Sequence, residues 1–375
     1  MKRLLLTALL PLSLMLIALP LLLAAGEAKE YVCPPCDMPC DARVFDKPGT
    51  CPACGARLVE RGAGAAATAG AAATTSRPKA AILVFEGVQI IDYTGPYEVF
   101  GQGGFDVYTV AEAKDALTTA MGMTVVPKFT FADAPKPDVV IVPGGNVTGP
   151  TNSAATLAWV KEQSRGARHV LSVCNGAFIL AKAGLLDNLS ATTFYRLIDD
   201  LRTAAPKTRV VSDRRFVDNG AIITSAGLSS GIDGALHVLS RMLGQGRAQA
   251  VALHMEYDWR PDSGFARAAL ADRLLRDVDL RDLGQTTVLK TEGTRDRWEI
   301  AVGVQTDLKP SDLREKVEGA LEQGHWIKAG ADQAPAGTSA WRRTEADGAA
   351  WKGRLSIQPD PAQDGQFTLT MNITR

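Results

Sequence analysis

The sequence predicts an α/β protein whose mainly parallel sheet carries helices on both faces. From residue 79 onward, short apolar runs typical of strands alternate with longer runs typical of helices. That alternation indicates right-handed βαβ units, which set parallel strands side by side and cover both faces of the sheet. A small Cys-rich ribbon before this region and a small α+β domain after it complete the expected architecture.

The length of the chain allows several domains, and its N-terminus predicts export. The chain has 375 residues, and Lys plus Arg and Asp plus Glu both number 41, so its charge gives no reason to expect a nucleic-acid partner. Residues 1–28 begin with the basic residues Lys2 and Arg3, continue as a long apolar run and end in small residues. This is the pattern of a secretory signal peptide. We expect cleavage and a periplasmic or secreted protein. The alternative is a retained N-terminal anchor in the inner membrane, which Pro11 and Pro20 disfavour.

Residues 29–61 contain two Cys-Pro-x-Cys knuckles, Cys33/Cys36 and Cys51/Cys54. Each knuckle places two sulfurs on one side of a tight turn, and two turns can complete a tetrahedron around a thiophilic ion. We therefore expect zinc, or another thiophilic metal, at these four cysteines. Cys40 remains as an alternative ligand or a redox-active neighbour. A pair of disulfides is the alternative in an oxidising compartment, although adjacent CxxC cysteines rarely form unstrained bridges.

This ribbon resembles the heavy-metal-binding domain of copper-efflux and related proteins. That family has Tyr-x-Cys-Pro, then Asp-x-Pro-Gly-x-Cys-Pro-x-Cys-Gly, and residues 31–55 carry the same pattern. Ala56 stands where the family usually has methionine, and Cys36 stands where histidine is common. Both changes favour structural zinc over a copper carrier. An Ala/Gly/Thr linker at 62–78 then separates the ribbon from the α/β domain at 79–283.

The strands and helices of the α/β domain are predicted from its apolar runs and from the turn residues that separate them. Expected strands are 80–85, 105–110, 138–142, 170–173 and 221–224. Expected helices begin near Pro96, span 153–164, and start again near 230 and 248. Ligands on parallel sheets bind at the carboxyl ends of the strands, where Cys174 and the Gly144-Gly145 pair both fall.

Cys174 ends the apolar strand at 170–173, and an Ala/Leu-rich helical run begins at once. A nucleophile elbow is such a strand-to-helix turn, and it keeps the positions two before and two after its tip small. Here they are Ser172 and Gly176. The N–H groups and positive dipole end of the following helix predict a lowered thiol pKa. A buried structural cysteine is the alternative.

Five stretches in order carry a specific resemblance: IIDYTGPYEVFG (90–101), VVIVPGG (139–145), SVCNGAFILAKAGLLDNLSATT (172–193), TSAGLSSGIDGALHVL (224–239) and MEYDWRP (255–261). They resemble the ThiJ/PfpI superfamily of class I glutamine-amidotransferase-like proteins, and more closely its branch of isonitrile hydratases and ligand domains of AraC-type regulators. The resemblance covers about residues 79–269. It implies a flavodoxin-like fold, a small-molecule substrate or ligand, and a homodimer.

The resemblance also implies roles for particular residues. In the family, an acidic residue before the Gly-Pro turn approaches the elbow cysteine, and Asp92 occupies that position. A partly buried acid has a raised pKa and can pass a proton; capping the next helix is the alternative role. Glu98 is a second acidic candidate, with a surface or interhelical ion pair as the alternative. The backbone N–H groups of Gly145 and Asn175 are expected to form an oxyanion hole, and the Cys174 site requires no cofactor.

Two departures from the family limit the reaction. Isonitrile hydratases have threonine after the cysteine, whereas this chain has Asn175, and many members have histidine where Phe194 stands. Without that imidazole a Cys/His peptidase or glyoxalase mechanism lacks its base. We expect an isonitrile-hydratase-like enzyme in which Cys174 attacks a small electrophilic carbon and Asp92 manages the proton. The alternative is a non-catalytic ligand-binding or thiol redox-sensing module coupled to metal binding.

The resemblance does not extend to the last 92 residues, 284–375. Strand-like stretches at 298–304, 338–344, 351–358 and 367–374, with a helix at 311–323, predict a small α+β domain. Its tryptophans are expected to form the core rather than a ligand cage; they are Trp298, Trp326, Trp341 and Trp351. No helix-turn-helix follows the α/β domain, which argues against a transcription factor.

Overall fold

A computed structural model describes residues 29–33, 43–52, 56–61, 77–263, 265–330, 335 and 337–375. The chain divides into two compact units, 1–71 and 72–375. The expected signal or anchor, most of the linker, and Cys36, Cys40 and Cys54 lie outside the described residues. Among the helices in the described ranges, none is long and apolar enough to cross a membrane.

The N-terminal unit contains a three-stranded antiparallel sheet in the order β2-β1-β3. Its strands are β1 (Tyr31–Val32), β2 (Val44–Phe45) and β3 (Val59–Glu60). Cys33 directly follows β1, and Cys33 and Cys51 are buried in one small cluster with Ala56 and Leu58. These two cysteines therefore belong to the same interior of the ribbon.

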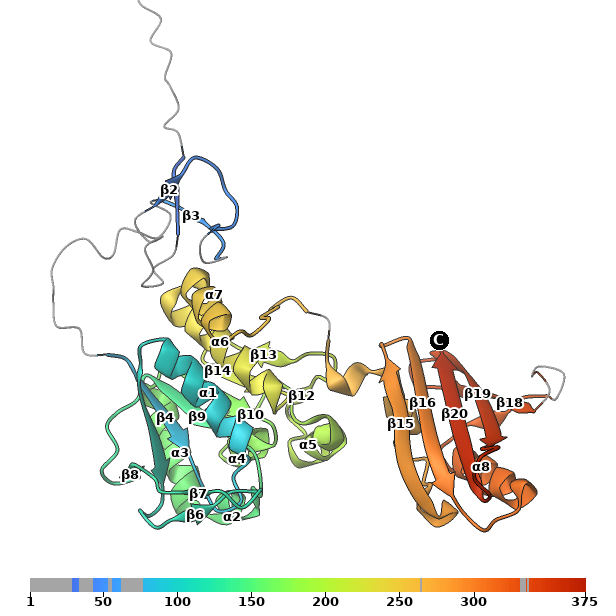
Figure 1. Ribbon diagram of the computed structural model, residues 1–375. Helices are drawn as coiled ribbons and strands as arrows, with labels where there is room; N and C mark the ends of the chain where they lie inside the picture. Colours follow the sequence, from blue (N-terminus) through green and yellow to red (C-terminus); the bar gives the residue numbers. More distant parts are fainter. Residues whose placement is uncertain are drawn as a thin grey trace, which may run out of the picture. The chain divides into compact units, whose positions relative to one another are not determined.

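The second unit is built on a seven-stranded sheet in the order β13-β14-β10-β9-β4-β5-β8 (Figure 1). All neighbouring strands are parallel except β13, which pairs antiparallel with β14. The strands are β4 (Lys79–Leu83), β5 (Asp106–Ala111), β8 (Phe129–Thr130), β9 (Val139–Val142), β10 (His169–Val173), β13 (Phe216–Asp218) and β14 (Ile222–Ser225). Two small ribbons lie outside this sheet: β6 (Leu117–Thr118) with β7 (Thr124–Val125), and β11 (Ser190–Ala191) with β12 (Arg209–Val210).

The helices form two groups on the sheet. One group contains α1 (Ile90–Gln102), α6 (Ser229–Leu243) and α7 (Gln245–His254), which contact one another. The other contains α2 (Thr148–Asn152), α3 (Ala154–Gly166), α4 (Gly176–Lys182) and α5 (Ile198–Ala204). This is the mixed α/β, flavodoxin-like arrangement that the sequence predicted.

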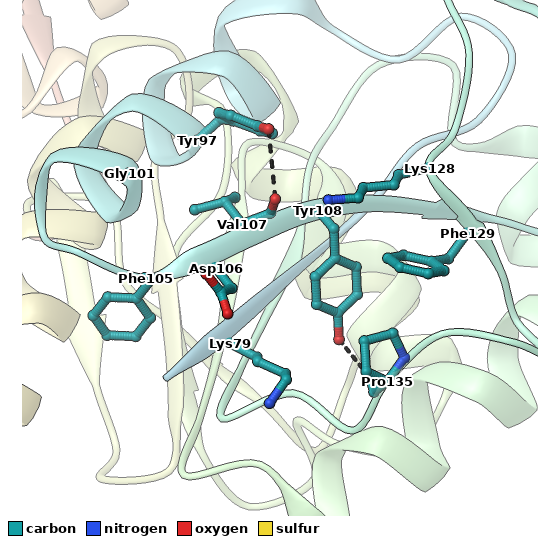
Figure 2. Close-up of a pocket in the computed structure, with 10 residues that line it drawn as sticks. All are labelled: Lys79, Tyr97, Gly101, Phe105, Asp106, Val107, Tyr108, Lys128, Phe129 and Pro135. Atoms are coloured by element: carbon teal, nitrogen blue, oxygen red, sulfur yellow. Dashed lines mark hydrogen bonds between the residues drawn. The ribbon is translucent and has the colours of Figure 1, made fainter. Parts of the chain in front are cut away.

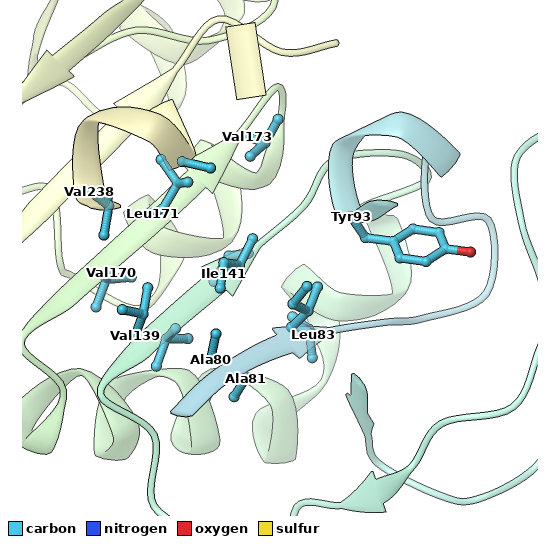
Figure 3. Packing of buried hydrophobic residues seen from close by; sticks show 14 of the residues in the cluster. Ala80, Ala81, Leu83, Tyr93, Val139, Ile141, Val170, Leu171, Val173 and Val238 are labelled. Atoms are coloured by element: carbon cyan, nitrogen blue, oxygen red, sulfur yellow. The ribbon is translucent and has the colours of Figure 1, made fainter. Parts of the chain in front are cut away.

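The central strands are mainly apolar because both faces of the sheet are covered. Every residue of β9 and β10 is buried. Figure 3 shows the resulting packing, in which Val139 and Ile141 lie on one strand and Leu171 on the adjacent strand, and Val238 of α6 belongs to the same cluster. This rigid core fixes the positions of the loops at the carboxyl ends of the strands.

The predicted start of the first helix is wrong. A helix beginning near Pro96 was expected because proline favours the first turn, yet α1 begins at Ile90 and contains Pro96 in its interior. Burial of one side of α1, including Tyr93, Pro96 and Phe100, outweighs the unfavourable proline. Asp92 consequently lies in the first turn of the helix instead of ahead of it.

The C-terminal part forms a six-stranded antiparallel sheet in the order β15-β16-β20-β19-β18-β17. Its elements are β15 (Gln285–Gly293), β16 (Arg297–Gln305), α8 (Pro310–Gln323), β17 (Ile327–Lys328), β18 (Thr338–Thr344), β19 (Ala350–Pro359) and β20 (Gln366–Thr374). Three short 3₁₀ turns precede it: Arg267–Ala269, Ala271–Leu275 and Arg281–Leu283. Strand β15 was not predicted, since all nine of its residues are exposed and a register shift falls between Val288 and Lys290.

The four tryptophans of this part are core residues, as predicted. Trp298, Trp326, Trp341 and Trp351 are all buried in one apolar cluster. The indole nitrogen of Trp326 donates to the carbonyl of Leu274 at 3.1 Å, and that of Trp351 donates to Glu345 at 2.9 Å. These large buried side chains give the C-terminal part an interior of its own.

Candidate active site

Cys174 lies at the tip of the turn between β10 and α4 with a backbone φ of 57°. A non-glycine residue in this region is strained, and such strain is common at active sites. The turn depends on Gly176, because a β-carbon there would lie 2.1 Å from the carbonyl oxygen of Val142. Ser172 is completely buried. The turn thus has the local geometry that the small residues at both positions indicated.

Asp92 is completely buried and faces the Cys174 side chain. One carboxyl oxygen accepts a hydrogen bond from the Gly144 N–H at 3.1 Å, and the other accepts from the Leu228 N–H at 2.9 Å. The Cys174 thiol hydrogen-bonds to the same carboxyl group. Elements far apart in the sequence therefore place one carboxyl and one thiol in direct contact.

The pKa values of this pair are both raised. Burial raises the pKa of Asp92 to about 6, against the opposing effect of its hydrogen bonds from Leu228 and Gly144. Burial also raises the pKa of the Cys174 thiol, the negative charge of Asp92 raises it further, and the Asn175 N–H opposes both. The expected lowering of the thiol pKa is therefore wrong, because desolvation outweighs the N-terminus of the seven-residue helix α4. Near neutral pH the Asp92 side chain is therefore a carboxylate, and the protonated Cys174 thiol donates a hydrogen bond to it.

Two glycines lie closely against the Cys174 side chain. A β-carbon at Gly144 would lie 2.8 Å from Cys174 Cβ and 2.9 Å from an Asp92 carboxyl oxygen. A β-carbon at Gly227, whose φ is +95°, would lie 2.9 Å from the sulfur itself. Contacts this short are excluded for real side chains, so both positions must lack one if the pair is to form.

The side chain of Asn175 hydrogen-bonds to the Gly145 N–H, one of the two amides that were expected to serve as oxyanion donors. Its Oδ1 accepts from the Gly145 N–H at 2.8 Å, and its Nδ2 donates to the Gly145 carbonyl at 2.8 Å. The Asn175 N–H itself bonds to the Cys174 sulfur. In the structure both N–H groups have partners inside the protein, and a role of Gly145 and Asn175 as anion donors stays a prediction.

Leu228 is a residue of the site that sequence reasoning missed. It occupies the second position of a turn closed by the Ser230 N–H and the Gly227 carbonyl, with φ 50° and ψ −125°. These are the angles of a type II′ turn, where glycine is the favoured residue. The strained conformation aims the Leu228 N–H at Asp92. Only the motif TSAGLSSG marks the position in the sequence, and nothing in it reveals the strain.

Substitution at position 228 should expose this strain. We expect Leu228→Gly to be more stable than Leu228→Ala by about 1–2 kcal/mol, because both remove the side chain but only glycine relaxes at a positive φ. The measurement is the free energy of unfolding of the two variants in urea. At an ordinary helical or extended position the glycine variant is less stable than the alanine variant. A Leu228→Gly variant less stable than Leu228→Ala would therefore contradict the strain.

A partly buried ion pair stabilises the loop that carries Leu228. Arg215 Nε donates to Asp233 at 2.6 Å, and the Tyr257 hydroxyl donates to the same carboxylate at 3.1 Å. Arg215 also donates to Ser229 Oγ at 3.1 Å. This network gives the MEYDWRP stretch a structural role, since its tyrosine helps to fix α6 immediately after the strained turn.

The remaining titratable candidates lie elsewhere. Glu98 is exposed on α1 and accepts a hydrogen bond from Gln102 at 2.8 Å. His169 and His237 hydrogen-bond to Gly220 and Asp218, respectively. The other two histidines, His254 and His325, are exposed. In the described ranges, therefore, the candidate reacting groups are Cys174 and Asp92.

A cavity of about 530 Å³ lies at the other end of the sheet. Figure 2 shows Lys79 and Asp106 at the start of β4 and β5, with the Tyr108 hydroxyl donating to the Pro135 carbonyl. Because Cys174 follows the carboxyl end of β10, this cavity is separate from the Cys174 site.

Comparison with known proteins gives matches over the α/β region. Residues 78–241 match the DJ-1/PfpI family model. Isonitrile hydratase of Pseudomonas putida is 38% identical over 189 residues, which are 48% of this chain and 80% of that protein. The HTH-type transcriptional regulator GbdR of Pseudomonas aeruginosa is 28% identical over 137 residues, which are 36% of this chain and 37% of the regulator.

Among solved structures, a ThiJ/PfpI family protein from Pseudomonas syringae superposes with a TM-score of 0.46 and 31% identity. The superposition covers 50% of this chain and 78% of that one. All of these matches leave roughly half of the present chain uncovered.

Proposed function

The chain belongs to the DJ-1/PfpI family, and on that premise we propose that it is a cysteine-dependent hydratase of small isonitriles. The observation that supports this most is the hydrogen bond between the Cys174 thiol and the buried Asp92 carboxyl group. The 38% identity to an isonitrile hydratase, over 80% of that enzyme, supports the same substrate class.

The chemistry of an isonitrile suits such a pair. Its terminal carbon accepts both a nucleophile and a proton, so Cys174 sulfur forms the S–C bond while Asp92 takes the thiol proton and delivers it to the same carbon. The product of this step is a thioimidate, R–N=CH–S–Cys. Water then adds to that carbon, the C–S bond breaks, and an N-substituted formamide leaves while the thiol regains its proton. No net oxidation or reduction occurs.

The occupied Gly145 amide agrees with this reaction class. Hydrolysis of an ester or amide places negative charge on a carbonyl oxygen, and that oxygen needs free N–H donors. The isonitrile carbon carries no oxygen when sulfur attacks it, so addition requires no such donors. The reciprocal bonds between Asn175 and Gly145 can therefore stay in place during the first step.

The proposal is tested by incubating the purified full chain with a small alkyl or aryl isonitrile and following formamide by NMR. We expect catalytic formamide production and, after rapid acid quenching, a peptide containing Cys174 that carries the mass of one isonitrile. Formamide production no faster than in buffer would refute the hydratase.

A ligand-binding role without turnover is the second candidate. It is favoured by the match to a transcriptional regulator over much of the same region. Saturable binding of an isonitrile or related small molecule without formamide would support it. A redox-sensing role is disfavoured, because the raised pKa of the Cys174 thiol keeps it protonated and slow to oxidise.

For the N-terminal ribbon we propose a structural zinc site in an exported protein. Thiolates are the ligands that zinc prefers in closed sites, and Cys33 and Cys51 are buried in one cluster, as two knuckles of one site require. We expect about one zinc ion per chain by metal analysis, lost in Cys33→Ser and in Cys51→Ser. Cys40→Ser, the matched control, should keep its zinc. Full zinc content in the first two variants would contradict the site.

A further inference from the structure

The sheet of the C-terminal part buries one face against α8. Along β16, Trp298, Ile300, Val302 and Val304 alternate with residues on the opposite face. The tryptophans fill part of the interior, where a β-carbon at Gly353 would already touch both Trp326 and Trp341. Phe367 lies on the same face, and the side chains around the cavity described next are aliphatic or Met.

The aliphatic part of this interior encloses a cavity of about 110 Å³. Every residue that lines it is Leu, Ile, Val or Met, so no polar side chain faces the space. Its buried walls come from α8 and three neighbouring strands: Val317, Leu321, Val302, Leu355, Leu369 and Met371. A cavity with such walls offers water no hydrogen-bond partner, and apolar cavities of roughly 150 Å³ are known to stay dry and to bind benzene.

The cavity differs from a sealed packing defect because one side of it reaches the surface. Leu275, Val278, Leu280 and Ile300 also line it, and all four are only partly buried. Val278 and Leu280 belong to the irregular connection between the 3₁₀ turns Ala271–Leu275 and Arg281–Leu283, and Leu275 ends the first of these turns. A short displacement of that connection would admit a molecule without opening the sheet.

We propose that this cavity is a binding site for one small neutral apolar molecule, an aromatic ring or a branched alkyl group of about six carbon atoms. Hydrophobic burial and close contact with the aliphatic walls provide the affinity. A charged headgroup is excluded from the interior because no side chain there could pair with it. This inference is independent of the reaction at Cys174.

The test uses the full chain and fluorobenzene, observed by ¹⁹F NMR. We expect saturable binding at one site per chain. Val317→Phe places a ring in the cavity and should weaken binding at least about tenfold. Val126→Phe, the same substitution at a residue that is 63% exposed in the α/β part, should leave the affinity unchanged.

Cooperative thermal unfolding checks that Val317→Phe folds. If it does not, Val302→Ile adds one methylene group to the same wall and should weaken binding about threefold or more. Absence of saturable binding by the unmodified chain, or unchanged affinity in a folded cavity-filling variant, would overturn the proposal.

Discussion

Replacing Cys174 with serine is expected to lower kcat/KM for isonitrile hydration by at least about a thousandfold. The serine hydroxyl occupies nearly the same space, so the strained turn and the contact with Asp92 can persist. It is, however, a far poorer nucleophile than the sulfur, and a carboxylate with a pKa of about 6 is too weak a base to activate it. Formamide production followed by NMR gives the rate.

Two controls make the Cys174→Ser result specific. Cys40→Ser removes a thiol outside the α/β domain and should keep full activity. Circular dichroism and the melting temperature should show that Cys174→Ser is folded. Activity of that variant within tenfold of the unmodified chain would contradict nucleophilic attack by sulfur.

Replacing Asp92 with asparagine should lower kcat about 10²–10⁴-fold, the usual effect of losing a general acid–base group. The amide fills the same buried space but cannot take the thiol proton and deliver it to carbon. Glu98→Gln is the matched control, since it neutralises an exposed acid on the same helix. Equal losses in both variants would show that Asp92 acts only through the stability of α1.

The pH dependence follows from the same pair. Because the pKa of Asp92 is raised to about 6, kcat/KM should be constant near neutral pH and fall as the pH drops below about 6. Protonation of the carboxylate removes the acceptor for the thiol proton, so the one-proton state of the pair is lost. Asp92→Asn should abolish this acidic limb. An unchanged limb in that variant would assign the titration to another group.

Much of the α/β architecture could be predicted from the sequence because it depends on local pattern. The runs at 170–173 and 138–142 are mainly apolar and are followed by turns, and each strand was predicted to within one residue. The helix starting at Ile90 could not be placed in this way, since Pro96 is a local helix breaker. Packing of that helix against the core decides its start, and such packing is not a local property.

In the candidate site, too, local features could be predicted from the sequence and long-range contacts could not. The elbow at Cys174 follows from a strand, a helix and small flanking residues, all readable in order. The state of its thiol depends on burial and on a carboxyl group 82 positions earlier in the chain. Likewise, the bonds between Asn175 and Gly145 join two loops that only the folded sheet brings together. Distances between such loops are set by the whole fold.

The outermost strand β15 bears on how the protein behaves at high concentration. A long exposed edge strand is ordinarily a template on which other chains add and grow into fibrils. Here the bulge between Val288 and Lys290 breaks the regular spacing of the backbone groups, and Lys290 is held by Glu292 and Glu299 at 3.1 and 2.9 Å. The bulge disrupts the hydrogen-bonding pattern that an incoming strand would need, and the paired charges of Lys290, Glu292 and Glu299 disfavour its approach. This edge strand is therefore protected against aggregation.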